Sequence, residues 1–374
     1  MKKKKRLKKP VRKELIVFHI LLILTVFLGT LNIAQAKGYF IPEVSTDIKE
    51  DVFTQVKTIS LQEMSIEEKV AQMILVHGGA HNKAVWKKMQ IGGIHFFAME
   101  SEQLYVDIIS DFQDNMSIPF FVTVDLEGCL NPFANFKEFT PNEEISSINE
   151  ASIKGEEEAG FLSSIGVTVN LAPVVDLEDT IWLCRSFPGD DKNIAELSSA
   201  YISSLQEKGV SATAKHYPGK TLVVNDPHKS LVAAEINSED IYPYNYLISK
   251  ENAVDLVMVS HIITSGEVDS NHVPSSVSFE AIDSLKRTYD GLIISDDTMM
   301  LGLLDFYDGD IDQLYLDLVI AGQDILMNFN EDPNEIYNMI AVISEAVREG
   351  VITEERIDHS VKKILELKGF EVVE

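Results

Sequence analysis

"GLIISDDTMM", residues 291–300, joins a short apolar run to two adjacent aspartates. A short apolar run with β-branched residues and polar flanks is typical of a buried strand. The pattern recurs along the chain and predicts eight strands, at 73–76, 93–97, 120–124, 167–171, 212–214, 256–259, 292–294 and 324–327.

The segments between these runs are long enough for helices, so the sequence predicts an α/β fold with parallel strands and helical crossovers. Eight such strands close a (β/α)8 TIM barrel. An open, doubly wound sheet is the alternative. No repeat or Pro/Gly-rich linker divides residues 61–374. We therefore expect one barrel domain there, preceded by a linker at 37–60.

Two helices can be predicted in detail. Ser65 and Glu68 have the spacing of a capping box and should begin the first helix of the barrel. The last helix is expected over 354–367, because its apolar residues recur on one face that would pack on the barrel wall.

Residues 1–36 have the organisation of a targeting segment. Nine Lys or Arg and no acid lie within residues 1–13, followed by an apolar run at 15–33 and the small residues of Ala34-Gln35-Ala36. This is the order of a secretory signal peptide cleaved after Ala36, and an uncleaved membrane anchor is the alternative. Either way we expect export to the extracellular space or the cell envelope.

The remainder of the chain is strongly acidic. Residues 1–36 hold nine of the 32 basic and one of the 59 acidic residues, so the rest has 23 against 58 and a net charge of −35. Such a surface repels nucleic acid and suits a neutral substrate. The only two cysteines, Cys129 and Cys184, are either a disulfide or two separate thiols.

Polar and charged residues follow the predicted strands. Catalytic groups in barrels of this kind lie where strands end, at the carboxyl-terminal face. The residues at these positions are Asp125 and Glu127, Asp176 and Arg185, Lys215 and His216, Asp226 and His228, Ser260 and His261, and Asp296 and Asp297. The predicted barrel would therefore collect charged groups at one end.

Asp296 directly follows a predicted strand, where the backbone would aim its carboxylate at the barrel mouth. A carboxylate in that position could attack an anomeric carbon and form a glycosyl-enzyme intermediate. Asp297 would then support it or cap the next helix. The alternative is that both aspartates only begin that helix.

The pair Asp226 and His228 offers the proton donor that such a reaction needs. The ordinary pKa of histidine lies near working pH, and an aspartate two residues earlier would orient the ring. Asp-x-His is common by chance, so an exposed histidine with no catalytic role is the alternative.

Four further residues could bind sugar hydroxyls through charge-assisted hydrogen bonds: Asp125, Arg185, Lys215 and His216. The alternative is that these side chains only pair with one another. A metal-dependent hydrolase would need clustered histidines, whereas His77 and His81 have no evident partner in the sequence. No metal or other cofactor is expected.

Ordered motifs across most of the chain resemble glycoside hydrolase family 3, and within it the single-barrel β-N-acetylglucosaminidases that act on peptidoglycan fragments. The motifs are "SIEEKVAQMIL", "GGIHFFAME", "VDLEG", "NLAPVVDL", "CRSFPGD", "KHYPGK", "DPH", "MVSHIITSGEVD", "GLIISDDTMMLGL", "AGQDILM" and "RIDHSVKKILELKG". Their order is more specific than any single one of them.

The resemblance implies a role for each residue that matches a family motif. Asp296 would be the nucleophile, and His228 with Asp226 the acid/base dyad. Asp125, Arg185, Lys215 and His216 would contact the sugar. The implied activity is a retaining, exo-acting β-N-acetylhexosaminidase; a β-glucosidase, a sugar phosphorylase and a non-catalytic sugar-binding barrel are the alternatives.

The chain departs from the family pattern at two places. Cys129, Leu130 and Phe133 stand where the family has a glycine and two arginines, and Lys220-Thr221 stands where it has His-Gly. These changes bear on how the sugar is recognised, whereas the nucleophile and dyad positions are intact.

Overall fold

The computed structural model describes residues 57–177, 184–220, 226, 228–250 and 252–373. The predicted signal segment, 1–36, lies outside these residues, as does the linker up to residue 56. No helix within the described residues is long and apolar enough to cross a membrane.

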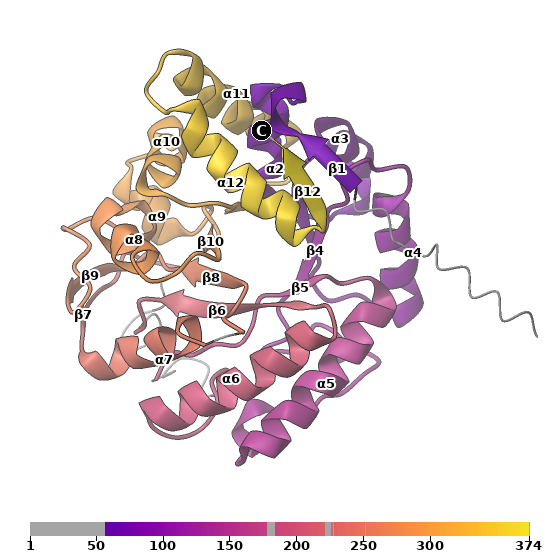
Figure 1. Ribbon diagram of the computed structural model, residues 1–374, viewed down its shortest axis with the longest axis vertical. Helices are drawn as coiled ribbons and strands as arrows, with labels where there is room; N and C mark the ends of the chain where they lie inside the picture. The colour runs from indigo at the N-terminus through magenta and orange to yellow at the C-terminus, as the bar shows by residue number, and fades with distance from the viewer. Residues whose placement is uncertain (1–56, 178–183, 221–225, 227, 251, 374) are drawn as a thin grey trace, which may run out of the picture. The chain divides into compact units, whose positions relative to one another are not determined.

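Eight parallel strands form the central sheet, in the order β10-β8-β6-β5-β4-β3-β2-β11. The sheet closes on itself because Ser295 N donates to Ile325 O (2.9 Å) and Ile325 N to Ile293 O (3.0 Å). The predicted barrel is thus confirmed as a nearly closed parallel one (Figure 1). The strands are β2 (Ile74–His77), β3 (Gly93–His95), β4 (Phe121–Val124), β5 (Val169–Asn170), β6 (Ser211–Tyr217), β8 (Leu256–Val259), β10 (Leu292–Ser295) and β11 (Leu326–Asn328).

Helices surround this barrel. In Figure 1, α5 and α6 lie side by side below β6, while α11 and α12 lie at the opposite end of the view. The helices are α2 (Ile66–Gln72), α3 (Lys83–Met89), α4 (Glu102–Gln113), α5 (Ile148–Ile165), α6 (Asp191–Glu207), α7 (Ser238–Ile248), α8 (Phe279–Lys286), α9 (Leu301–Phe306), α10 (Ile311–Ala321), α11 (Pro333–Arg348) and α12 (Glu354–Leu367).

The two helices predicted in detail are both present. Ser65 and Glu68 form the capping box that begins α2. α12 has the predicted bounds and buries an apolar face made of Ile357, Val361, Ile364 and Leu365. Because helices cover the outside of the barrel, strands such as β4, β8 and β10 are buried along their whole length, which explains their continuous apolar sequences.

Several strand boundaries differ from the prediction. β6 extends three residues past the predicted 212–214, so Lys215 and His216 belong to the strand rather than the loop after it. The last strand begins at Leu326 and not at Asp324. Asp324 instead accepts hydrogen bonds from Ile293 N (3.0 Å) and Lys363 Nζ (3.0 Å), which ties α12 to the barrel.

Two small sheets were not predicted. β1 (Lys57–Ser60) pairs in parallel with β12 (Phe370–Val373), so residues 57–60, assigned from the sequence to the linker, form a strand. β7 (Ala233–Ile236) pairs in parallel with β9 (Ile263–Gly266). Each of these strands is short and partly exposed, so none has the apolar run by which the barrel strands can be recognised.

Candidate active site

A pocket of about 640 Å³ opens at the carboxyl ends of the barrel strands. Residues from seven of the eight strand ends and the loops after them line it. Every predicted site residue except Asp226 lines it. It is also lined by residues that the sequence analysis did not assign to the site, among them His95, Phe97, Glu127, Leu130 and Phe329.

Asp296 lies immediately after β10 and is only 8% exposed. Its amide donates to Val259 O (3.1 Å), and its Oδ1 accepts the amide of Asp297 (2.8 Å). Burial alone would raise the pKa of Asp296, but nearby His216, His261 and His228 more than offset this and lower it. The strand end therefore presents a fixed, ionised carboxylate to the pocket.

Asp297 supports this strand end and does not cap a helix. Its Oδ1 accepts amides from Met299 (3.1 Å) and Phe329 (3.2 Å), which joins the loop after β10 to the end of β11. Burial, with the neighbouring charge of Asp296, raises the pKa of Asp297 to about 6 despite these hydrogen bonds. Helix α9 begins only at Leu301, so the helix-capping alternative for this aspartate is wrong.

The two members of the predicted dyad are in direct contact. His228 Nδ1 lies 2.6 Å from Asp226 Oδ1, which also accepts the amide of His228 (3.0 Å). Lys229 pairs with the other carboxylate oxygen at 3.0 Å. Burial would raise the pKa of Asp226, but Lys229 and His228 lower it. The His228 side chain is 53% exposed and lines the pocket.

The loop that carries the dyad is held at its far end. Val232 O accepts the amide of Ile263, next to the β7–β9 sheet, and His228 O accepts the amide of Leu301 at the start of α9 (3.4 Å). Pro227, between the two dyad residues, lies outside the described part of the chain.

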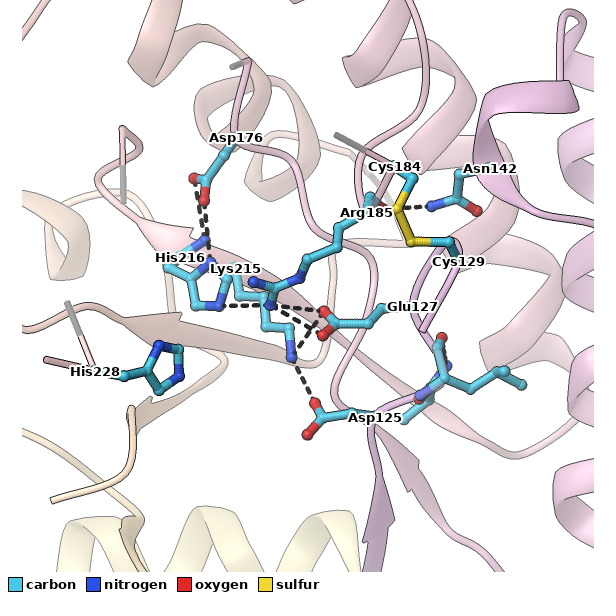
Figure 2. A network of polar contacts seen from close by, with 12 residues as sticks. Asp125, Glu127, Cys129, Asn142, Asp176, Cys184, Arg185, Lys215, His216 and His228 are labelled. Carbon is cyan, nitrogen blue, oxygen red and sulfur yellow. Dashed lines mark hydrogen bonds and ion pairs between the residues drawn. A yellow bond between two sulfur atoms is a disulfide. The ribbon is translucent and has the colours of Figure 1, made fainter. Parts of the chain in front are cut away.

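Oppositely charged side chains at the strand ends and in the loops after them form a network of ion pairs (Figure 2). Lys215 Nζ lies 2.6 Å from Asp125 Oδ1 and 3.1 Å from Glu127 Oε2. Arg185 Nη2 lies 2.9 Å from Glu127 Oε1. We call Asp125, Glu127, Arg185 and Lys215 the charged wall. Ion pairing was the alternative to sugar contact for these side chains. In the structure they pair with one another and also line the pocket, so sugar contact stays a prediction.

The charged wall is electrostatically balanced. Burial would lower the pKa of Lys215 and of Arg185, but the carboxylates beside them raise both. Burial would raise the pKa of Asp125, yet the charge of Lys215 and its hydrogen bond to the carboxylate hold the pKa at about 2. Asp125, Arg185 and Lys215 are therefore ionised at neutral pH, and their side chains are already oriented before a ligand binds.

His216 belongs to a second chain of contacts behind the wall. Its Nδ1 lies 3.0 Å from Asp176 Oδ2, and its Nε2 lies 3.3 Å from Arg185 Nη2. Tyr244 OH donates to the same aspartate (3.2 Å). Asp176 thus fixes the ring of His216, as a carboxylate partner commonly does.

His95 was missed by sequence reasoning. It is fully buried at the end of β3, with Nδ1 2.9 Å from Thr123 Oγ1. Its Nε2 has no hydrogen-bond partner among the described residues. Burial lowers the pKa of His95 to about 4, so the ring is neutral. A histidine inside the apolar run of a strand is the one signal in the sequence that could have indicated it.

The departures from the family pattern occupy distinct places. Leu130 lines the pocket, but Phe133 is fully buried in an aromatic cluster with Tyr105 and Phe161 and does not reach it. Cys129 and Cys184 form a disulfide, which settles the alternatives left open by the sequence.

The histidines considered for a metal site are engaged elsewhere. His77 Nδ1 pairs with Glu331 Oε1 at 2.6 Å, and His81 approaches the same carboxylate at 3.8 Å. In the described ranges, no three His, Cys, Asp or Glu side chains are grouped so as to hold a metal ion.

Known proteins resemble this chain in sequence and in fold. A β-N-acetylglucosaminidase/β-glucosidase of Cellulomonas fimi is 24% identical over 86% of this chain, which spans 60% of that protein. The β-hexosaminidase LpqI of Mycobacterium bovis is 25% identical over 82% of this chain and 83% of its own. The solved structure of Mycobacterium tuberculosis LpqI superposes with a TM-score of 0.75 at 22% identity, over 84% of this chain and 99% of that one.

The sequence also matches a family model. The model of the glycosyl hydrolase family 3 N terminal domain matches residues 65–367, from the capping box of α2 to the last residue of α12. That range contains every strand of the barrel and the whole pocket. On this match, the chain belongs to glycosyl hydrolase family 3.

Proposed function

We propose that this protein is a retaining, exo-acting β-N-acetylhexosaminidase that hydrolyses terminal β-linked N-acetylglucosamine from peptidoglycan or related glycans. The observation that supports it best is a buried, ionised Asp296 facing the same pocket as a histidine already bound to a carboxylate. Relatives named β-hexosaminidase and β-N-acetylglucosaminidase support the same activity.

In the first step, Asp296 attacks the anomeric carbon and forms a covalent bond to it. Asp296 Oδ1 accepts the amide of Asp297, so Oδ2 is the oxygen that we expect to attack. The bond to the leaving oxygen breaks, and that oxygen takes a proton from His228 Nε2. Asp226 holds the Nδ1 side of the ring, which leaves Nε2 to carry the transferred proton.

In the second step, His228 accepts a proton from water, and the resulting hydroxide oxygen displaces Asp296 from the anomeric carbon. Two displacements restore the β configuration, and the proton that His228 donated in the first step is regained. The charged wall, with His216, would hold the sugar hydroxyls during both steps by charge-assisted hydrogen bonds.

A fluorinated sugar that accumulates as the covalent intermediate tests this mechanism. We expect mass mapping to find the label on the peptide that contains Asp296. A label on any other residue would defeat the mechanism. Turnover of p-nitrophenyl β-N-acetylglucosaminide should be unchanged by a chelator, and loss of turnover there would favour a metal-dependent reaction instead.

A β-glucosidase activity is the second candidate, because the Cellulomonas fimi relative is named for both activities. Comparing kcat/KM for p-nitrophenyl N-acetylglucosaminide and glucoside separates the two. Running the same assay in phosphate buffer tests phosphorolysis: formation of a sugar 1-phosphate would replace hydrolysis in the proposal, since an imidazole repels phosphate less than a carboxylate does.

We also propose that the protein works outside the cytoplasm. The basic and apolar segment at 1–36 and the Cys129–Cys184 disulfide support this, because disulfides persist in oxidising compartments. Sequencing the amino terminus of the mature protein tests it. A first residue of Lys37 indicates cleavage after Ala36, a retained segment indicates an anchor, and recovery from the cytoplasm would contradict export.

A further inference from the structure

The Cys129–Cys184 disulfide joins two loops at the rim of the pocket (Figure 2). Cys129 follows β4 and lines the pocket, whereas Cys184 follows β5 and directly precedes Arg185. The Cα atoms are 5.5 Å apart, and Cys129 N donates to Cys184 O (3.2 Å). The bond therefore connects the loop that carries Glu127 to the residue next to the arginine with which Glu127 pairs.

The two loops approach each other closely at this bond. Gly128 has φ +55°, and a Cβ atom placed on it would lie 2.2 Å from Cys184 O and 2.7 Å from the Cα atom of Arg185. A side chain at position 128 would thus push the loops apart. Any separation of the loops moves the backbone of Arg185 directly.

The position of Arg185 depends on few anchors. Its Nη2 contacts Glu127 Oε2 (3.0 Å) and lies 3.3 Å from His216 Nε2, and its carbonyl oxygen accepts a hydrogen bond from Asn142 Nδ2 (2.7 Å). Its Nε is buried without a hydrogen-bond partner among the described residues. Burying a guanidinium with an unpaired donor is unfavourable, so this geometry needs restraint from the backbone, and the disulfide supplies a covalent one.

We propose that the Cys129–Cys184 disulfide is a positioning element of the active site, which holds Arg185 against Glu127 and so sets the affinity for the sugar. The inference rests on the proposed function.

The test compares the oxidised protein with the same protein reduced by dithiothreitol. Reduction breaks the one S–S bond; two electrons and two protons come from the dithiol, which becomes its cyclic disulfide. Because the chain has only two cysteines, any effect of reduction comes from this bond. The matched controls are the double variant Cys129→Ser with Cys184→Ser, which dithiothreitol cannot alter, and Arg185→Ala.

We expect reduction to raise KM for p-nitrophenyl N-acetylglucosaminide by about 10-fold, the loss of one hydrogen bond to a charged group. The value of kcat should change much less, because Asp296, Asp226 and His228 lie on other loops. The double serine variant should show the raised KM with or without dithiothreitol. In Arg185→Ala, KM should already be raised, and reduction should add less than about 2-fold.

Two results would overturn the inference. One is an unchanged KM when thiol counting shows that the bond is broken. The other is an equal effect of reduction in Arg185→Ala and in the parent, which would mean that the disulfide acts elsewhere. If the oxidised parent turns over no glycoside, the proposed function fails, and binding of N-acetylglucosamine measured by calorimetry before and after reduction decides the inference on its own.

Discussion

The pocket is built from two kinds of region that differ in how firmly they are held. The strand ends and the loops after them present Asp296, which is buried, and the charged wall, whose members are paired with one another and buried except for Asp125. The loop after β6 presents the pair of Asp226 and His228, whose histidine is more than half exposed. The groups proposed to bind and attack the sugar are thus firmly held, whereas the group proposed to move protons lies on the surface.

The difference has a chemical reason. A nucleophile and its binding partners need fixed geometry, and buried ion pairs on strand ends supply it. An acid/base group must exchange protons with water between the two steps, so exposure suits it. Mutations in the two regions should therefore produce different combinations of effects on activity and on stability.

The largest effect is expected from Asp296→Asn. Loss of the nucleophile should lower kcat at least about 10⁴-fold, whatever the leaving group, because no intermediate can form. Steady-state rates on activated and unactivated glycosides measure it. A variant that keeps more than a hundredth of the parental kcat would remove Asp296 from the role of nucleophile.

His228→Ala should act selectively. With a poor leaving group, loss of the proton donor should lower kcat/KM by about 10² to 10⁴-fold. With an activated aryl leaving group, the rate of the first step should fall far less, because the leaving oxygen of such a substrate needs no proton. An equal loss on both substrates would show the dyad interpretation to be wrong. Since His228 is exposed, the free energy of unfolding should change by less than about 0.5 kcal/mol.

Lys215→Met should show the opposite combination. Lys215 Nζ lies within 3.1 Å of both Asp125 and Glu127, and the change removes this shared partner. Breaking a buried pair of this kind should lower the free energy of unfolding by about 3 kcal/mol, measured by chemical denaturation. KM should rise as well. If Lys215→Met is as stable as His228→Ala, the contrast between the two regions does not hold.

The smallest effect is a pH dependence that comes from Asp297. Burial raises its pKa in the folded protein to about 6, above the value of an unfolded aspartate near 4. The folded state thus binds the proton more tightly, and this group lowers stability as pH rises from about 4 to 6. Asp297→Asn keeps an oxygen for the amides of Met299 and Phe329 and removes the titrating group.

We therefore expect unfolding curves of the parent and of Asp297→Asn to diverge over that interval. The variant should gain at most about 3 kcal/mol relative to the parent by pH 7. Denaturation at pH 4.5, 5.5, 6.5 and 7.5 measures the difference. Parallel pH profiles would show that Asp297 is not the group that titrates.

The sequence alone predicted the barrel, the end of the barrel at which polar groups gather, and the contact of Asp226 with His228. These features are local. Each buried strand is an apolar run of four or so residues, and Asp226 lies only two residues from the histidine that it contacts. Neighbours in sequence have few relative positions open to them, so pattern and spacing are sufficient.

Only the tertiary structure decided how the charged wall is paired and which disulfide links the two loops beside it. Lys215 meets Asp125 across 90 residues, Arg185 meets Glu127 across 58, and Cys184 meets Cys129 across 55. It also decided that His95 faces the pocket and that Phe133 does not. Such contacts depend on which strand ends become neighbours when the sheet closes. No local pattern of residues encodes which strand ends those will be.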